Sequence, residues 1–162
     1  MKKIFKAMFV LVCGLVMTMA LGACGSDGDD GGNKKEFTIN GDWMNAYILN
    51  GTNIEFYTLN GSSASCVAYV LSGYNVISGT TLNIQNITNI TKKVYNGYFT
   101  YDKLQLICTF PEGKIEGFVT VHDYEEFVWS IGFSNIEMIR ANSKTNALKS
   151  QLEQEYQNKY AN

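Results

Sequence analysis

Residues 127–133 read Phe-Val-Trp-Ser-Ile-Gly-Phe, and this stretch decides the fold class. Large apolar side chains alternate in it with others. On an extended chain the large ones fall on one face: Phe127, Trp129, Ile131 and Phe133. Such a period of two is typical of a β-strand with one buried side, because successive side chains of a strand point to opposite faces. The stretch therefore predicts a sheet that buries an aromatic face.

Strand-like sequence patterns also occur upstream and downstream of this stretch. Short segments rich in β-branched and aromatic residues alternate with Gly, Asn and Ser clusters, which is typical of strands and turns. We expect ten strands, at 37–49, 54–59, 65–71, 74–78, 81–87, 91–101, 103–110, 114–122, 125–133 and 135–140. Asn50-Gly51 and Asn60-Gly61 suit hairpin turns, since both residue types accept positive φ. Strands joined this closely pair antiparallel, because parallel neighbours need long crossovers.

The chain ends in a different pattern. Residues 143–160 contain no glycine or proline, and Leu148, Leu152, Tyr156 and Tyr160 recur at four-residue spacing. That spacing places them along one side of a helix, with Asn142 or Ser143 as its N-cap. We expect the helix to pack on the outside of the β-structure; the alternative is a helix that binds a partner.

These patterns together predict an all-β protein. The expected architecture is an antiparallel up-and-down β-barrel of about eight to ten strands with a C-terminal α-helix, and an open sandwich is the alternative. An eight-stranded barrel is wide enough to be filled by its own side chains or to hold one small ligand.

The N-terminal 24 residues carry a targeting pattern. Three lysines precede residue 7, an apolar run follows, and the segment closes with Leu21-Gly22-Ala23-Cys24. This is the layout of a secretory signal peptide, here 1–23. A transmembrane helix over 7–23 is the alternative, at the short limit for spanning. The last four residues resemble the lipobox of bacterial lipoproteins, which implies cleavage before Cys24 and lipid attachment to that residue.

Residues 24–36 are rich in Gly and Asp and contain no large apolar residue, so we expect a flexible tether. Ser26-Asp27 and Asp29-Asp30 resemble the acidic export tract of Bacteroidetes lipoproteins. The resemblance implies an outer-membrane lipoprotein exposed on the cell surface. The remaining residues, 37–162, are expected to form one domain.

Charge and cysteine content limit the partners. Without its three signal-peptide lysines, the chain has 10 basic residues against 15 acidic ones. No basic cluster is present for nucleic acid or anionic lipid, so membrane contact depends on acyl chains at Cys24. After Cys13 and Cys24 are accounted for, Cys66 and Cys108 remain. In an oxidising compartment they could form a disulfide; the alternative is two separate buried thiols.

Gly41-Asp42-Trp43 opens the first expected strand, and Arg140 ends the last one before the helix. This arrangement resembles the calycin superfamily, in particular the lipocalin-like lipoproteins of gut bacteria. The resemblance implies that the Arg140 guanidinium covers the Trp43 indole and closes one end of the barrel. A cation over an indole face is a stabilising contact.

Catalytic and metal patterns are missing from the sequence. His122 is the lone histidine, no Cys-x-x-Cys occurs, and no glycine-rich loop precedes a helix. The consecutive carboxylates Glu125 and Glu126 point to opposite faces of a strand and cannot act as a pair. We therefore expect no enzyme activity, no metal and no cofactor.

The sequence therefore predicts a lipid-anchored, lipocalin-like protein of the cell envelope that binds a small apolar or amphipathic ligand. The residues expected to line the cup are Tyr95, Phe99, Phe127 and Trp129. The alternative is a non-enzymatic surface protein with a solid barrel or sandwich, which binds glycan or protein or serves as a subunit of an envelope complex. An apolar cavity favours the first function, and a packed interior with exposed aromatic residues favours the second.

Overall fold

The computed structural model describes residues 35–48, 52–76 and 84–160. The chain divides into two compact units, Met1–Glu36 and Phe37–Asn162, and the described structure belongs almost entirely to the second. The predicted signal peptide, Cys24 and the tether up to residue 34 lie outside the described residues.

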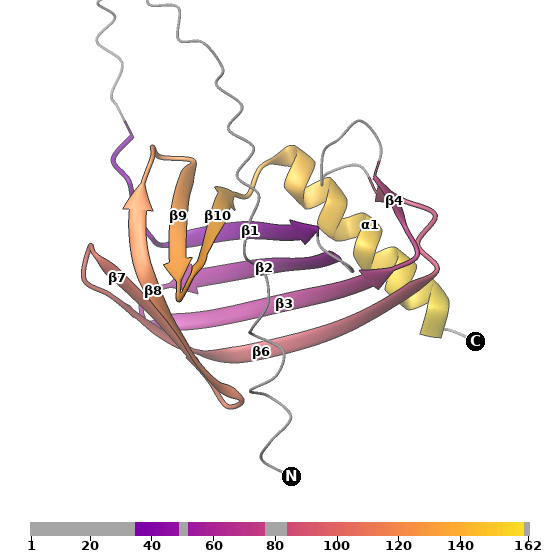
Figure 1. Cartoon of the computed structure of the whole chain (residues 1–162), viewed down its shortest axis with the longest axis horizontal. Helices are drawn as coiled ribbons and strands as arrows, with labels where there is room; N and C mark the ends of the chain where they lie inside the picture. The colour runs from indigo at the N-terminus through magenta and orange to yellow at the C-terminus, as the bar shows by residue number, and fades with distance from the viewer. Residues whose placement is uncertain (1–34, 49–51, 77–83, 161–162) are drawn as a thin grey trace, which may run out of the picture. The chain divides into compact units, whose positions relative to one another are not determined.

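Eight antiparallel strands close into a barrel in the order β1-β10-β9-β8-β7-β6-β3-β2 (Figure 1). Their bounds are β1 Gly41–Ile48, β2 Thr52–Asn60, β3 Ser63–Ser72, β6 Asn89–Tyr101, β7 Gln105–Phe110, β8 Gly113–Val121, β9 Glu126–Ile131 and β10 Ser134–Arg140. The first strand pairs with both the second and the last, which closes the sheet. The predicted barrel is confirmed, and the open sandwich is excluded.

Two of the ten expected strands do not belong to the barrel. In the described parts of the segments expected at 74–78 and 81–87, which are 74–76 and 84–87, the strands are the two-residue β4 (Asn75–Val76) and β5 (Ile84–Gln85). These two pair with each other as a separate small sheet. The barrel therefore lies at the lower limit of the expected strand number.

The alternation of residues 127–133 ends earlier than the sequence predicts. Phe127 and Trp129 are fully buried and Ile131 packs against the same core, but β9 stops at Ile131. Gly132 then takes a φ of +58°, a left-handed conformation that glycine adopts without strain, and the chain turns into β10. Phe133 lies in this turn and is completely exposed, so the expectation that it shares the buried face is wrong.

Two apolar cores lie on opposite faces of the same strands. The inward core fills the barrel and contains Trp43, Tyr57, Phe127 and Trp129. The outward core contains Met44, Phe56 and Tyr69. Each of these residues is adjacent in the sequence to an inward residue. Long strands with two buried faces explain why the early strands lack a simple alternation of apolar and polar residues.

The outward core is covered by α1 (Ser143–Tyr160), which crosses near the ends of β1, β2 and β3 in Figure 1. Leu148 and Leu152 are buried in this core and Tyr156 packs against it, while Tyr160 is half exposed. The Asn142 side chain caps the helix by accepting hydrogen bonds from the backbone N–H groups of residues 144 and 145. Within the described chain, no helix has the length and apolar character needed to cross a membrane.

Small residues let the barrel walls approach its large aromatic side chains. A Cβ added to Gly117 would lie 2.3 Å from the Ser130 carbonyl oxygen and 2.8 Å from the Trp129 indole. A Cβ on Gly97 would lie 2.0 Å from the Thr109 carbonyl oxygen. Glycine is required at both positions because the neighbouring strand approaches too closely for a side chain. Backbone and aromatic atoms of the neighbouring strands occupy the space that a Cβ would need.

Candidate functional site

Arg140 closes one end of the barrel. Its Cζ lies 4.2 Å from the centre of the Trp43 ring and 4.4 Å from that of Tyr124, so the guanidinium lies between two aromatic rings. Its three nitrogen atoms donate hydrogen bonds to backbone carbonyls: Nε to Tyr124 at 2.9 Å, Nη1 to Asn40 at 3.2 Å and Nη2 to Thr38 at 2.7 Å. One side chain thereby ties together the segment before β1, the β8–β9 turn and the end of β10.

The glycine of the Gly41-Asp42-Trp43 motif has a specific part in this closure. A Cβ at Gly41 would lie 2.5 Å from Arg140 Nη1, and the φ of this residue is +142°. A larger residue would therefore displace the guanidinium and strain the backbone. The indole Nε1 of Trp43 donates to the Ile39 carbonyl at 2.8 Å, which fixes the ring under the arginine. The structure thus brings Trp43 and Arg140 together as the resemblance implies.

Cys66 and Cys108 do not form the disulfide that the sequence allows. Both are buried free thiols of the inward core. Cys66 of β3 pairs with Tyr95, and Cys108 of β7 pairs with Phe99, so β6 lies between the two cysteines. Two strand spacings amount to roughly 9–10 Å, whereas disulfide-bonded Cα atoms lie within about 7 Å of each other. Burial raises the pKa of both thiols, that of Cys108 to about 12.

Three of the four predicted cup residues are packed in the core. Phe127 and Trp129 have no exposed surface at all, and Phe99 has almost none. Phe127 meets Trp43 edge to face at 4.7 Å between ring centres, and Trp129 meets Tyr57 at 6.0 Å. Because water cannot reach Phe127 or Trp129, neither ring lines an open cavity. Aromatic packing fills this end of the barrel, as it fills an ordinary protein interior.

Tyr95 is the fourth predicted residue, and it lies at the margin of the packed core. It is partly buried and contacts the Phe110 ring at 5.9 Å. Burial raises its pKa, with further contributions from Cys66, Glu112 and Glu55. Tyr95 is therefore the predicted cup residue that lies next to both the packed core and acidic groups.

A polar group that the sequence did not reveal lies on the same inward barrel wall as Tyr95. Glu55 accepts three hydrogen bonds, from Asn45 Nδ2 at 2.9 Å, from Asn53 Nδ2 at 2.7 Å and from the Tyr57 hydroxyl at 2.8 Å. We call these four residues the Glu55 cluster. Burial and the Glu55 charge raise the pKa of Tyr57 well above its usual value. The hydroxyl therefore remains a donor to the carboxylate.

The Glu55 cluster faces the inside of the barrel. On β2, Glu55 lies two residues before Tyr57, and on β1, Asn45 lies two residues after Trp43; both reference residues belong to the inward core. Asn45 is only 1% exposed. The oxygens Asn45 Oδ1 and Asn53 Oδ1 are both buried without a hydrogen-bond partner among the described residues. Native proteins rarely leave such atoms unsatisfied, so a partner for these acceptors is expected.

The wall opens at the level of this cluster. β10 pairs with β1 at Trp43 and Met44, and among the described residues no further β10 partner follows along β1. On the other side, the described pairing of β6 with β7 involves only residues 98–101, while β6 begins at Asn89. Around Glu55 the described wall consists of β1, β2, β3 and β6, so the cluster lies beyond the closed end, where the strands separate.

The signal for this cluster is present in the sequence. Asn45, Asn53 and Glu55 alternate with apolar residues and share a face with Trp43 and Tyr57. Polar residues at inward positions normally indicate either a solvated face or a binding site. The pairing register places Asn45 opposite Glu55 and so brings the polar residues of β1 and β2 together.

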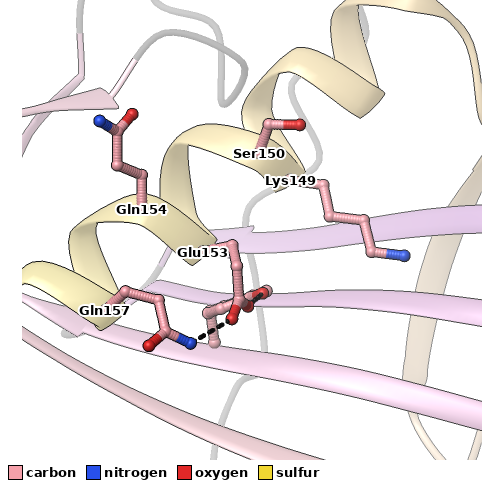
Figure 2. A pocket seen from close by; sticks show the side chains of 6 residues that line it. Lys149, Ser150, Glu153, Gln154 and Gln157 are labelled. Carbon is pink, nitrogen blue, oxygen red and sulfur yellow. Dashed lines mark hydrogen bonds between the residues drawn. The ribbon is translucent and has the colours of Figure 1, made fainter. Parts of the chain in front are cut away.

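An outer groove offers a second surface (Figure 2). It lies between α1 and β3 and is lined by Tyr69, Lys149, Ser150, Glu153, Gln154 and Gln157. Its carboxylate is already satisfied: Glu153 accepts from Lys92 at 2.6 Å, from Gln157 at 2.9 Å and from Tyr69. These donors, Lys92 first, lower the pKa of Glu153 to about 2. These hydrogen bonds therefore hold the helix on the sheet, and they leave no free hydrogen-bonding site for a ligand at the Glu153 carboxylate.

Compared with family models, with curated proteins and with solved structures, the chain matches none of them. The chemistry of the site is therefore the evidence for a function. Among the described residues, no group of three or more His, Cys, Asp or Glu could hold a metal ion.

Proposed function

We propose that this chain is a lipid-anchored, lipocalin-like lipoprotein of the bacterial cell envelope that binds a small amphipathic ligand in its barrel. The observation that carries the binding function is the Glu55 cluster, with its partly buried carboxylate and two unpartnered buried oxygens on an inward wall. A solid barrel would gain nothing from these groups, because burying polar atoms without partners is costly. An occupant of the open end would satisfy them.

The expected ligand was apolar or amphipathic, and the packed core favours the amphipathic one. An apolar ligand would need the space that the Phe127 and Trp129 rings already fill. The open end offers instead a polar wall at Glu55 and partly buried apolar side chains at Tyr95, Ile115 and Ile131. A molecule with a polar head and a short apolar part matches both.

Anchoring is tested by labelling growing cells with radioactive palmitate and recovering the chain. We expect label on the wild-type chain and none on a Cys24→Ser variant, in which the acceptor sulfur is missing. Equal labelling of the two, or none on either, would contradict anchoring at Cys24.

Ligand binding is tested by native mass spectrometry of the full chain extracted from its own host in mild detergent. A reproducible additional mass, released on unfolding, is expected. A bare mass in repeated preparations would favour the interaction protein. A separate observation supports the interaction protein: three aromatic side chains are more than half exposed on the outer surface, those of Tyr98, Phe118 and Phe133.

A further inference from the structure

We propose that the Glu55 cluster binds the ammonium head of an organic amine, so that the ligand of the barrel is a cationic amphiphile. This inference rests on the proposed function and specifies the chemistry of its ligand.

The open hydrogen-bonding capacity of the cluster consists of acceptors. A carboxylate can only accept, so both asparagines must turn their Nδ2 donors toward Glu55 and their Oδ1 atoms away from it. The Tyr57 hydroxyl also donates to Glu55. What remains is Asn45 Oδ1, Asn53 Oδ1 and one acceptor site on Glu55 Oε1. A ligand that satisfies these atoms must donate hydrogen bonds, and a primary ammonium carries three N–H donors.

The charge of the cluster also favours a cation. Among the described residues the ion pairs are Lys92–Glu153 and Lys114–Glu116, and neither involves Glu55. The basic residue on the same inward face is Lys93, which is separated from Glu55 by Ala68 in the strand pairing and is exposed. Glu112 adds a second negative charge near Tyr95. A partly buried carboxylate without an ion-pair partner is stabilised by a cationic ligand.

A metal ion fits this site less well than an organic cation. Ca²⁺ takes six to eight oxygen ligands, several of them from carboxylates, in its usual protein sites. The Glu55 cluster has one carboxylate, which already accepts three hydrogen bonds. Tyr95 and Ile115 are partly buried hydrophobic residues that pack against the inward core, and they provide a surface for the carbon chain of an amine.

The test compares three probes with the same six-carbon chain: hexylammonium, hexan-1-ol and hexanoate. Each is titrated calorimetrically into the lipid-anchored chain in phosphatidylcholine nanodiscs, with empty nanodiscs as the reference. We expect hexylammonium to bind at least about tenfold more tightly than hexan-1-ol, because its bonds to the cluster are charge-assisted, and hexanoate to bind most weakly. A titration with CaCl₂ alone should give no heat at the site.

Three variants test whether the preference for hexylammonium arises at the Glu55 cluster. Glu55→Gln should remove the preference for hexylammonium, whereas Glu137→Gln, the same change at an exposed position of β10, should preserve it. Lys93 is exposed, and none of the hydrogen bonds within the Glu55 cluster involves it, so Lys93→Gln leaves those bonds in place. It should tighten hexylammonium about twofold by removing a positive charge roughly 10 Å away, and leave hexan-1-ol unchanged.

The outcomes separate the two proposals. Equal binding of hexylammonium and hexan-1-ol, tighter binding of hexanoate, or a response to CaCl₂ alone would overturn the ammonium site and leave a ligand-binding barrel. Binding that Lys93→Gln and Glu55→Gln both leave unchanged would place the probe elsewhere and also overturn it. Absence of binding by all three probes would overturn the binding function together with this inference.

Discussion

Replacing Arg140 with alanine tests how the barrel is closed. The change removes hydrogen bonds to three backbone carbonyls and a guanidinium held at 4.2 and 4.4 Å from two ring centres. The site is partly exposed, so water replaces part of what is lost. We assign about 1 kcal/mol to each of the two shorter hydrogen bonds and about 0.5 kcal/mol to each aromatic contact. The free energy of unfolding should then fall by about 3 kcal/mol.

Urea unfolding followed by circular dichroism measures this loss. With a slope of about 1.5–2 kcal/mol per molar urea for a domain of this size, the midpoint should fall by roughly 1.5–2 M at unchanged slope. Arg140→Lys should recover only a minor part, because an ammonium keeps the charge but cannot stack as a plane or reach three carbonyls at once.

Lys114→Ala provides the matched control. It removes a basic residue whose ion pair with Glu116 is half exposed, so its effect should stay below about 0.5 kcal/mol. If Arg140→Ala shifts the midpoint no more than this control does, the arginine does not close the barrel and the reasoning fails.

Three further predictions concern the packing, the helix and the thiols. Gly117→Ala should lower the free energy of unfolding by about 1–3 kcal/mol in urea titrations, because its Cβ would lie 2.3 Å from a backbone oxygen; an unchanged midpoint would contradict the close packing. Glu153→Gln should cost up to about 1 kcal/mol at pH 7, because the exposed pair with Lys92 is screened by solvent. Since the pKa of Glu153 is lowered to about 2 in the folded state, this contribution is complete above pH 4.5 and should disappear as the pH falls toward 2; a difference independent of pH would contradict it. Thiol titration of the unreduced mature chain should find Cys66 and Cys108 unreactive when folded and two thiols per chain after unfolding, whereas a disulfide would give none.

The sequence predicts the barrel and the helix well because both depend on local patterns. Segments rich in β-branched and aromatic residues, bounded by turn residues, locate all eight barrel strands, and four-residue spacing locates a helix whose bounds are those of α1. Where the local signal stops, prediction fails: one glycine with positive φ ends β9 and exposes Phe133. The alternation of apolar residues in the sequence continues past Gly132. The positive φ of Gly132 belongs to the turn, and the alternation does not reveal it.

The candidate site was harder to predict because it depends on pairing between strands. No local pattern shows that Cys66 and Cys108 are separated by β6, or that Asn45 lies opposite Glu55. The aromatic residues expected to line a cup are equally suited to filling one, and packing decided between these roles at Phe127 and Trp129. The contact of Trp43 with Arg140 was accessible only through a resemblance, since 97 positions separate the two residues along the chain.

We propose that a cationic amphiphile enters the barrel at the Glu55 cluster. The most direct test is nuclear Overhauser spectroscopy of the full chain with hexylammonium in deuterated detergent. We predict contacts between the methylene next to the ammonium and the side-chain amide protons of Asn45 and Asn53. Contacts to Tyr69 and Lys149 of the outer groove, without any to the two asparagines, would contradict the account.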